Sequence, residues 1–512
     1  MTKGASFPSE ALSSVVTLFG ELHSRAVRYC HWKSTAGLPL ALAGKTDLDL
    51  LVDTEQAELF ADVVSGCGFK RFLSHPSRRF PFVEDWLGFD ARSGRLVHLH
   101  VYYRLIVGED YVKNHALPLE EPFLGSTVER HGIRVPAPAL ELMVLILRAL
   151  LKYRDADAAK DFLRLGRRGG VPPAIRGEVD DLATRTSAAE VMEAAARLLP
   201  AMPAEVFSGF LSTLSADRRN ARSLVRLRSQ ARRGLRAYER LPRSRARATY
   251  FAARASRLPV VRQLIGQLSR RELRRKSPLR GGITVALVGA DGAGKSTLVE
   301  AMRAWLGWRV NLSVAYLGTS RPSRRTAVAQ LASRVARAAA NRAAGRRYPG
   351  SRLLAGAADY VTATRYLMEA LDRAARVRAG RSLAADGAVV VFDRYPLRFV
   401  RQDGRFVDGP RIAQLGPRVS RGLLDAFRRR EEATYRRIPP PDVAFLLTIP
   451  AELAVARKEA ERPAAVQRKA LAIERAVSSL QSEERDDIVV VDATRPLESV
   501  IRDVKSEIWR RL

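Results

Sequence analysis

Residues 283–297, ITVALVGADGAGKST, decide the fold of the carboxy-terminal half of the chain. Residues 283–288 are all apolar or β-branched, which predicts a buried strand. Residues 289–296 match the pattern GxxxxGK[ST] in full, and a helix-forming segment follows from Thr297. A strand, this loop and a helix in direct succession are the structural context that the pattern requires. The stretch therefore predicts a phosphate-binding loop in a parallel α/β sheet.

The residue types in this loop suit phosphate binding. Its glycines let the backbone curl so that successive N–H groups face the phosphates, and the helix that follows adds partial positive charge. Lys295 places an ammonium at the phosphate being transferred, and the Ser296 hydroxyl is a ligand for Mg²⁺. The residues that we expect to bind ATP here are Gly289, Gly292, Ala293, Gly294, Lys295, Ser296 and Thr297. Both ATP and Mg²⁺ are therefore expected cofactors.

A second predicted strand of this region ends in an Asp-Arg pair. Residues 389–395 read VVVFDRY, so Asp393 and Arg394 follow an apolar run. Ligands of open α/β sheets bind at the carboxyl ends of the strands. There Asp393 can hold Mg²⁺ or orient the acceptor, and Arg394 can neutralise phosphate charge. The alternative is a structural aspartate paired with its neighbour, but the loop upstream favours the functional interpretation.

The chain divides into three regions by pattern. Residues 1–165 alternate strand-like and helix-like runs, which predicts an α+β domain, and residues 166–280 read as an Arg-rich helical connector. In residues 281–512, apolar runs separated by long helical stretches predict a doubly wound parallel α/β sheet. The elements expected in the first region are a helix over 12–25, a strand over 48–52, a helix over 55–65 and a hairpin turning at Ser93-Gly94.

Four segments in this order resemble thymidylate kinases and related nucleoside monophosphate kinases. They are the loop, FDRY at 392–395, PDVAFLLTIPAELAVARKEAERP at 441–463, and VVVDATRPLESVIRDV at 489–504. The resemblance covers nearly all of residues 282–512. It implies transfer of the ATP γ-phosphate to a nucleoside monophosphate, with dTMP as the first candidate.

The resemblance also implies roles for single residues. Those with an implied catalytic role are Asp291, Lys295, Asp393, Arg394, Arg457 and Arg462. In the family, the carboxylate at Asp291 contacts the acceptor nucleoside, and Arg457 and Arg462 occupy the places of lid arginines. Ala493 and Thr494 match the loop on the adenine side. Gly292 stands where some members carry an arginine, so the lid would have to supply that positive charge.

The sequence departs from the family where the acceptor would bind. Residues 396–403 read PLRFVRQD, where thymidylate kinases usually have a serine and an Ala-Tyr-Gln segment. An Arg-rich insertion at 321–347 also falls there. The acceptor could therefore be another small molecule, such as a sugar or glycan precursor. A nucleotide-binding scaffold at a membrane surface, without turnover, is a further alternative.

The amino-terminal region carries a second candidate site. The run GKTDLDLLV places Asp47 and Asp49 on one face of a strand. This resembles the Asp-x-Asp of small nucleotidyltransferase domains, in which paired carboxylates hold Mg²⁺. His98 and His100, on a later strand, stand where a third carboxylate is usual, and the segment 32–34 lacks the glycine of the family's Gly-Ser turn. An active nucleotidyltransferase and a degenerate binding module both stay open.

Net charge and cysteine content bear on partners and location. The formal net charge is +33, with clusters of arginine in residues 217–280 and 321–347. A solvated helical face is one explanation, and contact of residues 217–280 with an anionic membrane surface is another. Nucleic acid is not an expected partner, because no recognition motif accompanies the charge. Two cysteines and no evident leader indicate a cytoplasmic protein; peripheral attachment to the inner face of the membrane and a homodimer stay open.

Overall fold

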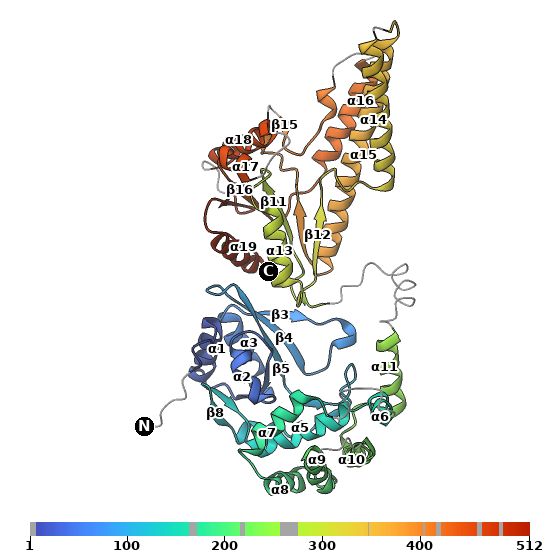
Figure 1. Ribbon diagram of the computed structural model, residues 1–512. Helices are drawn as coiled ribbons and strands as arrows, with labels where there is room; N and C mark the ends of the chain where they lie inside the picture. Colours follow the sequence, from blue (N-terminus) through green and yellow to red (C-terminus); the bar gives the residue numbers. More distant parts are fainter. Residues whose placement is uncertain are drawn as a thin grey trace. The chain divides into compact units, whose positions relative to one another are not determined.

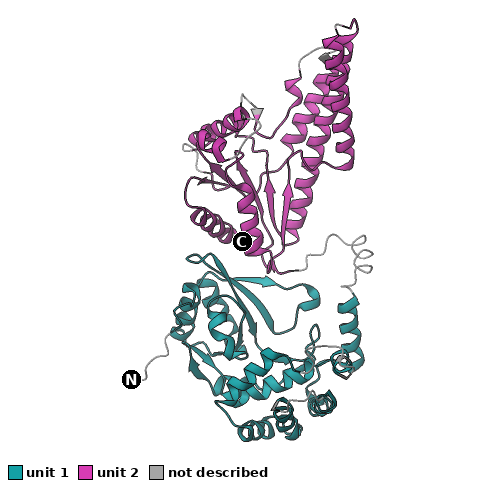
Figure 2. Cartoon of the chain, in the orientation of Figure 1, with its two compact units in different colours: residues 1–272 teal, residues 273–512 magenta. Residues whose placement is uncertain are grey.

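The computed structural model forms two compact units, Met1–Glu272 (unit 1) and Leu273–Leu512 (unit 2), which Figure 2 distinguishes by colour. Each unit is described by itself. The residues that the structure describes are 7–162, 171–215, 221–255, 275–346, 348–402, 405–415, 421–457, 463–480 and 485–512.

Unit 2 is built on a parallel sheet with the strand order β12-β13-β11-β16-β17. Its strands are β11 (Thr284–Gly289), β12 (Leu312–Tyr316), β13 (Val389–Asp393), β16 (Val443–Thr448) and β17 (Ile488–Asp492). All residues of β11 are buried, as the apolar run predicts. The chain moves to one side of β11 to form β12 and β13 and to the other side for β16 and β17. This switch point, where such sheets bind ligands, lies beside the predicted loop. The predicted parallel α/β sheet is confirmed.

The helices of unit 2 include one long pair. They are α13 (Lys295–Leu306), α14 (Arg324–Gly345), α15 (Ser351–Ala385), α16 (Arg421–Arg436), α17 (Ala451–Arg457), α18 (Pro463–Leu480) and α19 (Leu497–Arg511). The Arg-rich insertion forms α14, which packs along α15 (Figure 1). Asp372 of α15 accepts hydrogen bonds from the Ser323 amide at 3.0 Å and the Thr326 hydroxyl at 2.7 Å, which fixes the start of α14. Two short strands, β14 (Arg401–Gln402) and β15 (Arg405–Phe406), pair with each other.

Unit 1 contains a mixed sheet in which strands follow the order β1-β2-β5-β4-β3. These strands are β1 (Tyr29–His31), β2 (Leu48–Val52), β3 (Lys70–Leu73), β4 (Val83–Asp90) and β5 (Arg95–Tyr102). The pair β2 and β5 is parallel, and the other pairs are antiparallel. Helices α1 (Ser13–Ser24) and α3 (Ala57–Gly66) and the β4–β5 hairpin lie where the sequence predicts them. Smaller elements are α2 (Leu38–Leu42), α4 (Glu120–Gly125) and the hairpins β6 (Leu105–Val107) with β7 (His115–Leu117) and β8 (Val128–Arg130) with β9 (Ile133–Val135).

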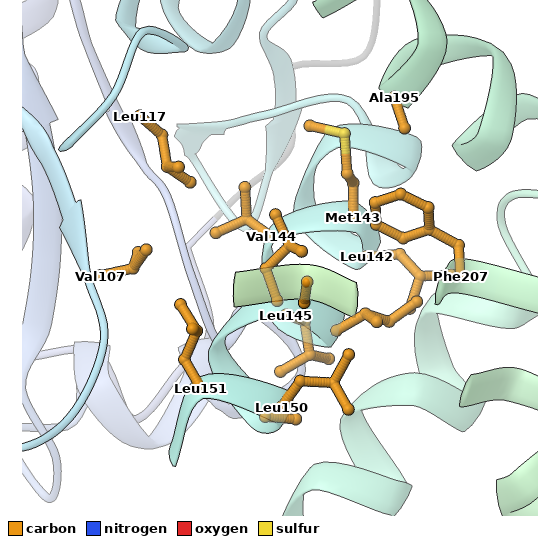
Figure 3. Close-up of a cluster of buried hydrophobic side chains, with 14 of the residues drawn as sticks. Val107, Leu117, Leu142, Met143, Val144, Leu145, Leu150, Leu151, Ala195 and Phe207 are labelled. Carbon is orange, nitrogen blue, oxygen red and sulfur yellow. The ribbon is translucent and has the colours of Figure 1, made fainter. Parts of the chain in front are cut away.

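The remaining helices of unit 1, except the last of them, contribute side chains to one core. They are α5 (Pro138–Lys152), α6 (Asp155–Phe162), α7 (Pro173–Ala183), α8 (Ala188–Leu198), α9 (Glu205–Ser215), α10 (Ala221–Gly234) and α11 (Arg243–Ala255). Figure 3 shows side chains of α5 meeting Ala195 of α8 and Phe207 of α9. Much of the expected connector over 166–280 therefore belongs to unit 1 instead of forming a separate segment.

The apolar stripe of α10 shows why. Leu224, Leu227, Ala231 and Leu235 are buried in this core, so the three- and four-residue spacing serves packing and not a membrane surface. The later part of the expected membrane contact, residues 256–274, lies outside the described residues. A membrane-spanning helix is not found in the part of the chain that the structure describes.

Candidate functional site

The predicted phosphate-binding loop connects β11 to α13. Gly292 and Gly294 have φ of +90° and +85°, a left-handed conformation that glycine adopts without strain. A Cβ atom at Gly292 would lie 2.6 Å from the carbonyl oxygen of Ala454, whereas one at Gly294 would meet no atom within 4 Å. The loop therefore needs its glycines for two reasons: backbone conformation at both positions, and the close approach of α17 at Gly292.

Lys295, the first residue of α13, turns back over the loop. Its Nζ donates hydrogen bonds to the carbonyl oxygens of Gly289 at 2.9 Å and Ala290 at 2.6 Å, and it lies 3.8 Å from the Asp291 carboxylate. Burial, and next the charge of Lys469, lowers the pKa of Lys295 to about 8. The ammonium is thus mostly charged at neutral pH but poorly compensated. An anion in the loop would compensate it better than two carbonyl groups can.

Asp393 and Arg394 lie at the same edge of the sheet as the loop. The parallel register of β11 and β13 sets Leu287 beside Asp393. The Asp393 Oδ1 atom is buried and has no hydrogen-bond partner among the described residues. Arg394, with a φ of +64°, donates to Asp291 Oδ1 at 2.9 Å across 103 positions of sequence. Such a backbone conformation costs free energy in a residue with a side chain, and residues of this kind concentrate at functional sites.

The oxygen atoms around the loop suit Mg²⁺. Ser296 exposes its hydroxyl at the start of α13, and the unpaired carboxylate oxygen of Asp393 lies at the neighbouring strand end. The described residues contain no group of three or more His, Cys, Asp or Glu side chains that could hold a metal ion. Mg²⁺ at a nucleotide site keeps several water ligands and takes others from the phosphates, so it needs only one or two protein oxygens. Ser296 and Asp393 therefore fit the role that the sequence predicts for them.

Three further charged residues line this region, and the sequence interpretation missed them. Asp408 and Lys469 of α18 form an ion pair of 2.6 Å. Burial would raise the pKa of Asp408, but Lys469 holds it below its usual value. The guanidinium of Arg373, on α15, donates to the Leu317 carbonyl at 2.8 Å and contacts the Asp408 carbonyl. The only sequence signal was the Asp-Gly dipeptide at 408, which predicts a turn but no charge cluster.

The predicted lid and adenine-side residues meet in part. Arg457 Nη1 donates to the carbonyl oxygen of Ala493 at 3.0 Å. The backbone N–H and hydroxyl of Thr494 bond to Asp492 Oδ1 at 2.9 Å and 2.7 Å, which makes a tight turn after β17. Arg462 lies in residues 458–462, outside the described residues. The catalytic roles of Arg457 and Arg462 therefore stay predictions.

In unit 1, the second candidate site is already neutralised. Asp49 Oδ1 lies 2.7 Å from the Lys33 ammonium and 3.2 Å from His100 Nδ1. Burial alone would raise the pKa of Asp49, but Lys33 and His100 hold it well below its ordinary value. Tyr102 Oη adds contacts to Lys33 at 3.3 Å and to Lys113 at 2.8 Å. Asp49 is therefore part of a buried network in which cations outnumber it.

The other carboxylate of the pair is engaged as well. His98 lies between Asp47, at 3.0 Å, and Asp85, at 2.8 Å. A Mg²⁺ ion at Asp47 and Asp49 would have to displace the Lys33 ammonium and compete with two imidazoles. The arrangement thus does not fit the expected pair of Mg²⁺-binding carboxylates, because both carboxylates are already paired with side chains of unit 1. The nucleotidyltransferase activity of unit 1 stays a prediction.

Comparisons with known proteins give little guidance. No protein-family model matches the chain, and no curated protein matches it. Among solved structures, one similar chain is a deoxyadenosine kinase from M. mycoides with bound dATP, at 13% sequence identity and a TM-score of 0.26. The match covers 44% of this chain and 98% of the kinase. A likeness this distant does not assign a function, so we argue from this chain's own residues.

Proposed function

We propose that unit 2 is a Mg²⁺-dependent phosphotransferase that moves the γ-phosphate of ATP to a small anionic acceptor, with a nucleoside monophosphate, dTMP first, as the acceptor to test. One observation carries the proposal. The undercompensated ammonium of Lys295 and the unpaired oxygen of Asp393 share one edge of the sheet with the Asp291–Arg394 pair. These are groups that phosphoryl transfer requires for charge neutralisation and positioning.

The donor side follows from the loop. ATP would place its phosphates against the loop amides, and Lys295 would exchange its two carbonyl partners for phosphate oxygens. Ser296 and Asp393 would hold Mg²⁺, which supplies charge neutralisation between the β- and γ-phosphates when bound. Asp393 needs little rearrangement for this role because its Oδ1 atom has no hydrogen-bond partner within the described part of the chain.

The acceptor side follows from the neighbouring cations. Arg394 fixes the Asp291 carboxylate, which the family resemblance assigns to the acceptor. Arg373 is 3% exposed, and the contacts described for its guanidinium are with carbonyl groups, the Tyr435 hydroxyl and the Tyr435 ring. These cations favour an acceptor that carries a phosphate over a neutral sugar. The proposal therefore ranks monophosphates first.

An acceptor screen tests this proposal. The full chain is incubated with ATP, Mg²⁺ and one acceptor at a time: dTMP, the other nucleoside monophosphates, and sugars with and without a phosphate. We expect the fastest transfer to a monophosphate, and a rate lower by about a thousandfold in the Lys295→Ala variant. Turnover of dTMP no faster than of unrelated acceptors would remove dTMP. ATP binding without transfer to any acceptor would favour the nucleotide-binding scaffold instead.

A further inference from the structure

Unit 1 contains a cavity of about 330 Å³ that shares no lining residue with either site described above. Its wall is formed by the segment between β6 and β7, the end of α5, the start of α6, and α11. Val107 and Leu117, on either side of this segment, and Leu151 of α5 belong to the buried cluster of Figure 3, so the floor of the cavity rests on the core. The volume is near the lower end of those that small-molecule sites have.

One buried side chain in the wall is unsatisfied. His115 is 7% exposed, and neither of its ring nitrogens has a hydrogen-bond partner among the described residues. Its backbone is fixed by pairing with Val107 in β6 and by a bridge to Glu239. Burial lowers the pKa of His115 to about 4, so the ring is neutral at pH 7 and offers one donor and one acceptor. Buried polar atoms normally have partners, so this ring points to a missing one.

The charges around the cavity favour an anion. Five arginines and three carboxylates line it, which leaves an excess of two positive charges. Each of the three carboxylates already has an arginine partner; the pairs are Glu109–Arg232, Asp155–Arg228 and Glu239–Arg243. Arg247 forms no ion pair within the described part of the chain. Its guanidinium is therefore available to a ligand.

An aromatic surface completes the wall. Tyr250 and Phe251 of α11 meet edge to face, with ring centroids 5.7 Å apart, and Tyr111, which does not line the cavity, has its ring 6.4 Å from that of Tyr250. Phe251 is 63% exposed, and α11 buries none of its residues. Exposed rings next to arginines offer both stacking and cation–π contacts to a flat molecule.

We propose that this cavity binds a small organic anion with a flat ring, either a phosphate monoester or a carboxylate. The charged group lies on Arg247, one of its oxygens accepts a hydrogen bond from the His115 ring, and the flat ring lies against Tyr250 and Phe251. The site shares no residue with the proposed phosphotransfer site.

Calorimetry with the full chain tests the site. The probes are 1-naphthyl phosphate, 1-naphthoate and the neutral 1-naphthol. Arg247→Leu should weaken binding of the charged probes at least tenfold. Arg245→Leu, which makes the same change on the same helix outside the cavity, should alter it less than twofold. His115→Leu should weaken binding several-fold without lowering the thermal midpoint, because it removes an unsatisfied buried group.

Each outcome decides something. Binding of either charged probe with this variant pattern supports the site and identifies the head group. Binding of neither probe, or equal losses in the two arginine variants, would overturn it. Equal binding of 1-naphthol would overturn the anion requirement.

Discussion

The two candidate sites use the same kinds of residue with opposite results. In unit 2, the Lys295 ammonium donates to two carbonyl groups with the Asp291 carboxylate 3.8 Å away, and the buried Oδ1 of Asp393 has no hydrogen-bond partner among the described residues. In unit 1, the Lys33 ammonium lies directly on Asp49, and His100 takes a further contact with it. The charged groups of the first site are still available to a ligand, whereas those of the second are already paired with each other and stabilise the fold.

Residue type alone therefore does not identify a ligand site. Buried lysines and aspartates at strand ends occur in both units, but a ligand can only use atoms that the protein leaves unpaired or weakly paired.

Removing the lysine of unit 2 should have the largest effect. Lys295→Ala should lower the rate of phosphotransfer by about a thousandfold, because the developing phosphate charge loses its nearest cation. The measurement is single-turnover transfer from labelled ATP. Lys45→Ala, which removes an exposed lysine paired with Glu10, serves as the control and should leave the rate unchanged. A loss of less than tenfold would contradict the role of Lys295.

Removing the lysine of unit 1 should affect stability instead. Lys33→Met leaves Asp49 buried without its cation and should lower the free energy of opening of β2 and β5 by about 3 kcal/mol. Hydrogen exchange followed by mass spectrometry locates the loss, and β11 should be unaffected. The double variant Lys33→Met with Asp49→Leu removes both charges and should recover much of the lost free energy of opening. If single and double variants lose equally, the ion pair is not the cause.

The unpaired carboxylate of unit 2 gives a smaller but more specific effect. Asp393→Asn should reduce transfer about a hundredfold and raise the Mg²⁺ concentration needed for half the maximal rate, because it removes a negative ligand. The rate is measured across a Mg²⁺ series. Asp386→Asn, at an exposed position after α15, is the matched control. An unchanged Mg²⁺ requirement would argue against a metal at Asp393.

The smallest predicted effect is a pH dependence in unit 1. Burial, and next Lys33, lowers the pKa of Lys113 to about 7, whereas an unfolded chain keeps this proton to about pH 10.5. The unfolded state thus binds more protons between pH 7 and 10.5, so the stability of unit 1 should rise with pH across that window. Below pH 7 the cost of burying the charge is fully present.

Lys113→Met tests this directly. It should flatten the rise and add about 1–2 kcal/mol at pH 7, measured by urea unfolding with pulse proteolysis to follow unit 1. Lys152→Met changes a more exposed lysine and should keep the rise. If the stability of the Lys113→Met variant still rises between pH 7 and 10.5, another titrating group causes the rise.

Much of unit 2 could be predicted from sequence because its signals are local. The loop from Gly289 to Ser296 carries its strand, turn and helix in consecutive residues, and Asp393 follows directly from its strand. The sequence does not, however, predict that the Lys295 side chain folds back and donates to the carbonyl oxygens of Gly289 and Ala290.

The rest could not be predicted because it depends on contacts distant in sequence. Lys469 reaches Asp408 across 61 positions, and neither residue belongs to a motif. Asp49 matches a metal-binding pattern, but Lys33 and His100 from two other segments decide its state. Likewise, the helices of the expected connector show clear periodicity, but periodicity does not say which core the apolar side belongs to.

Gly292 has a consequence for how this chain could change over generations. Codons for glycine and arginine differ by a single base, so one mutation is enough to place an arginine at this position. Here its Cβ would lie 2.6 Å from the Ala454 carbonyl oxygen, and the φ of +90° would strain it. The helix that carries Ala454 would have to shift before that arginine could be accepted. A single Gly292→Arg substitution should therefore strain the loop, whereas the same substitution after a shift of α17 should be tolerated better.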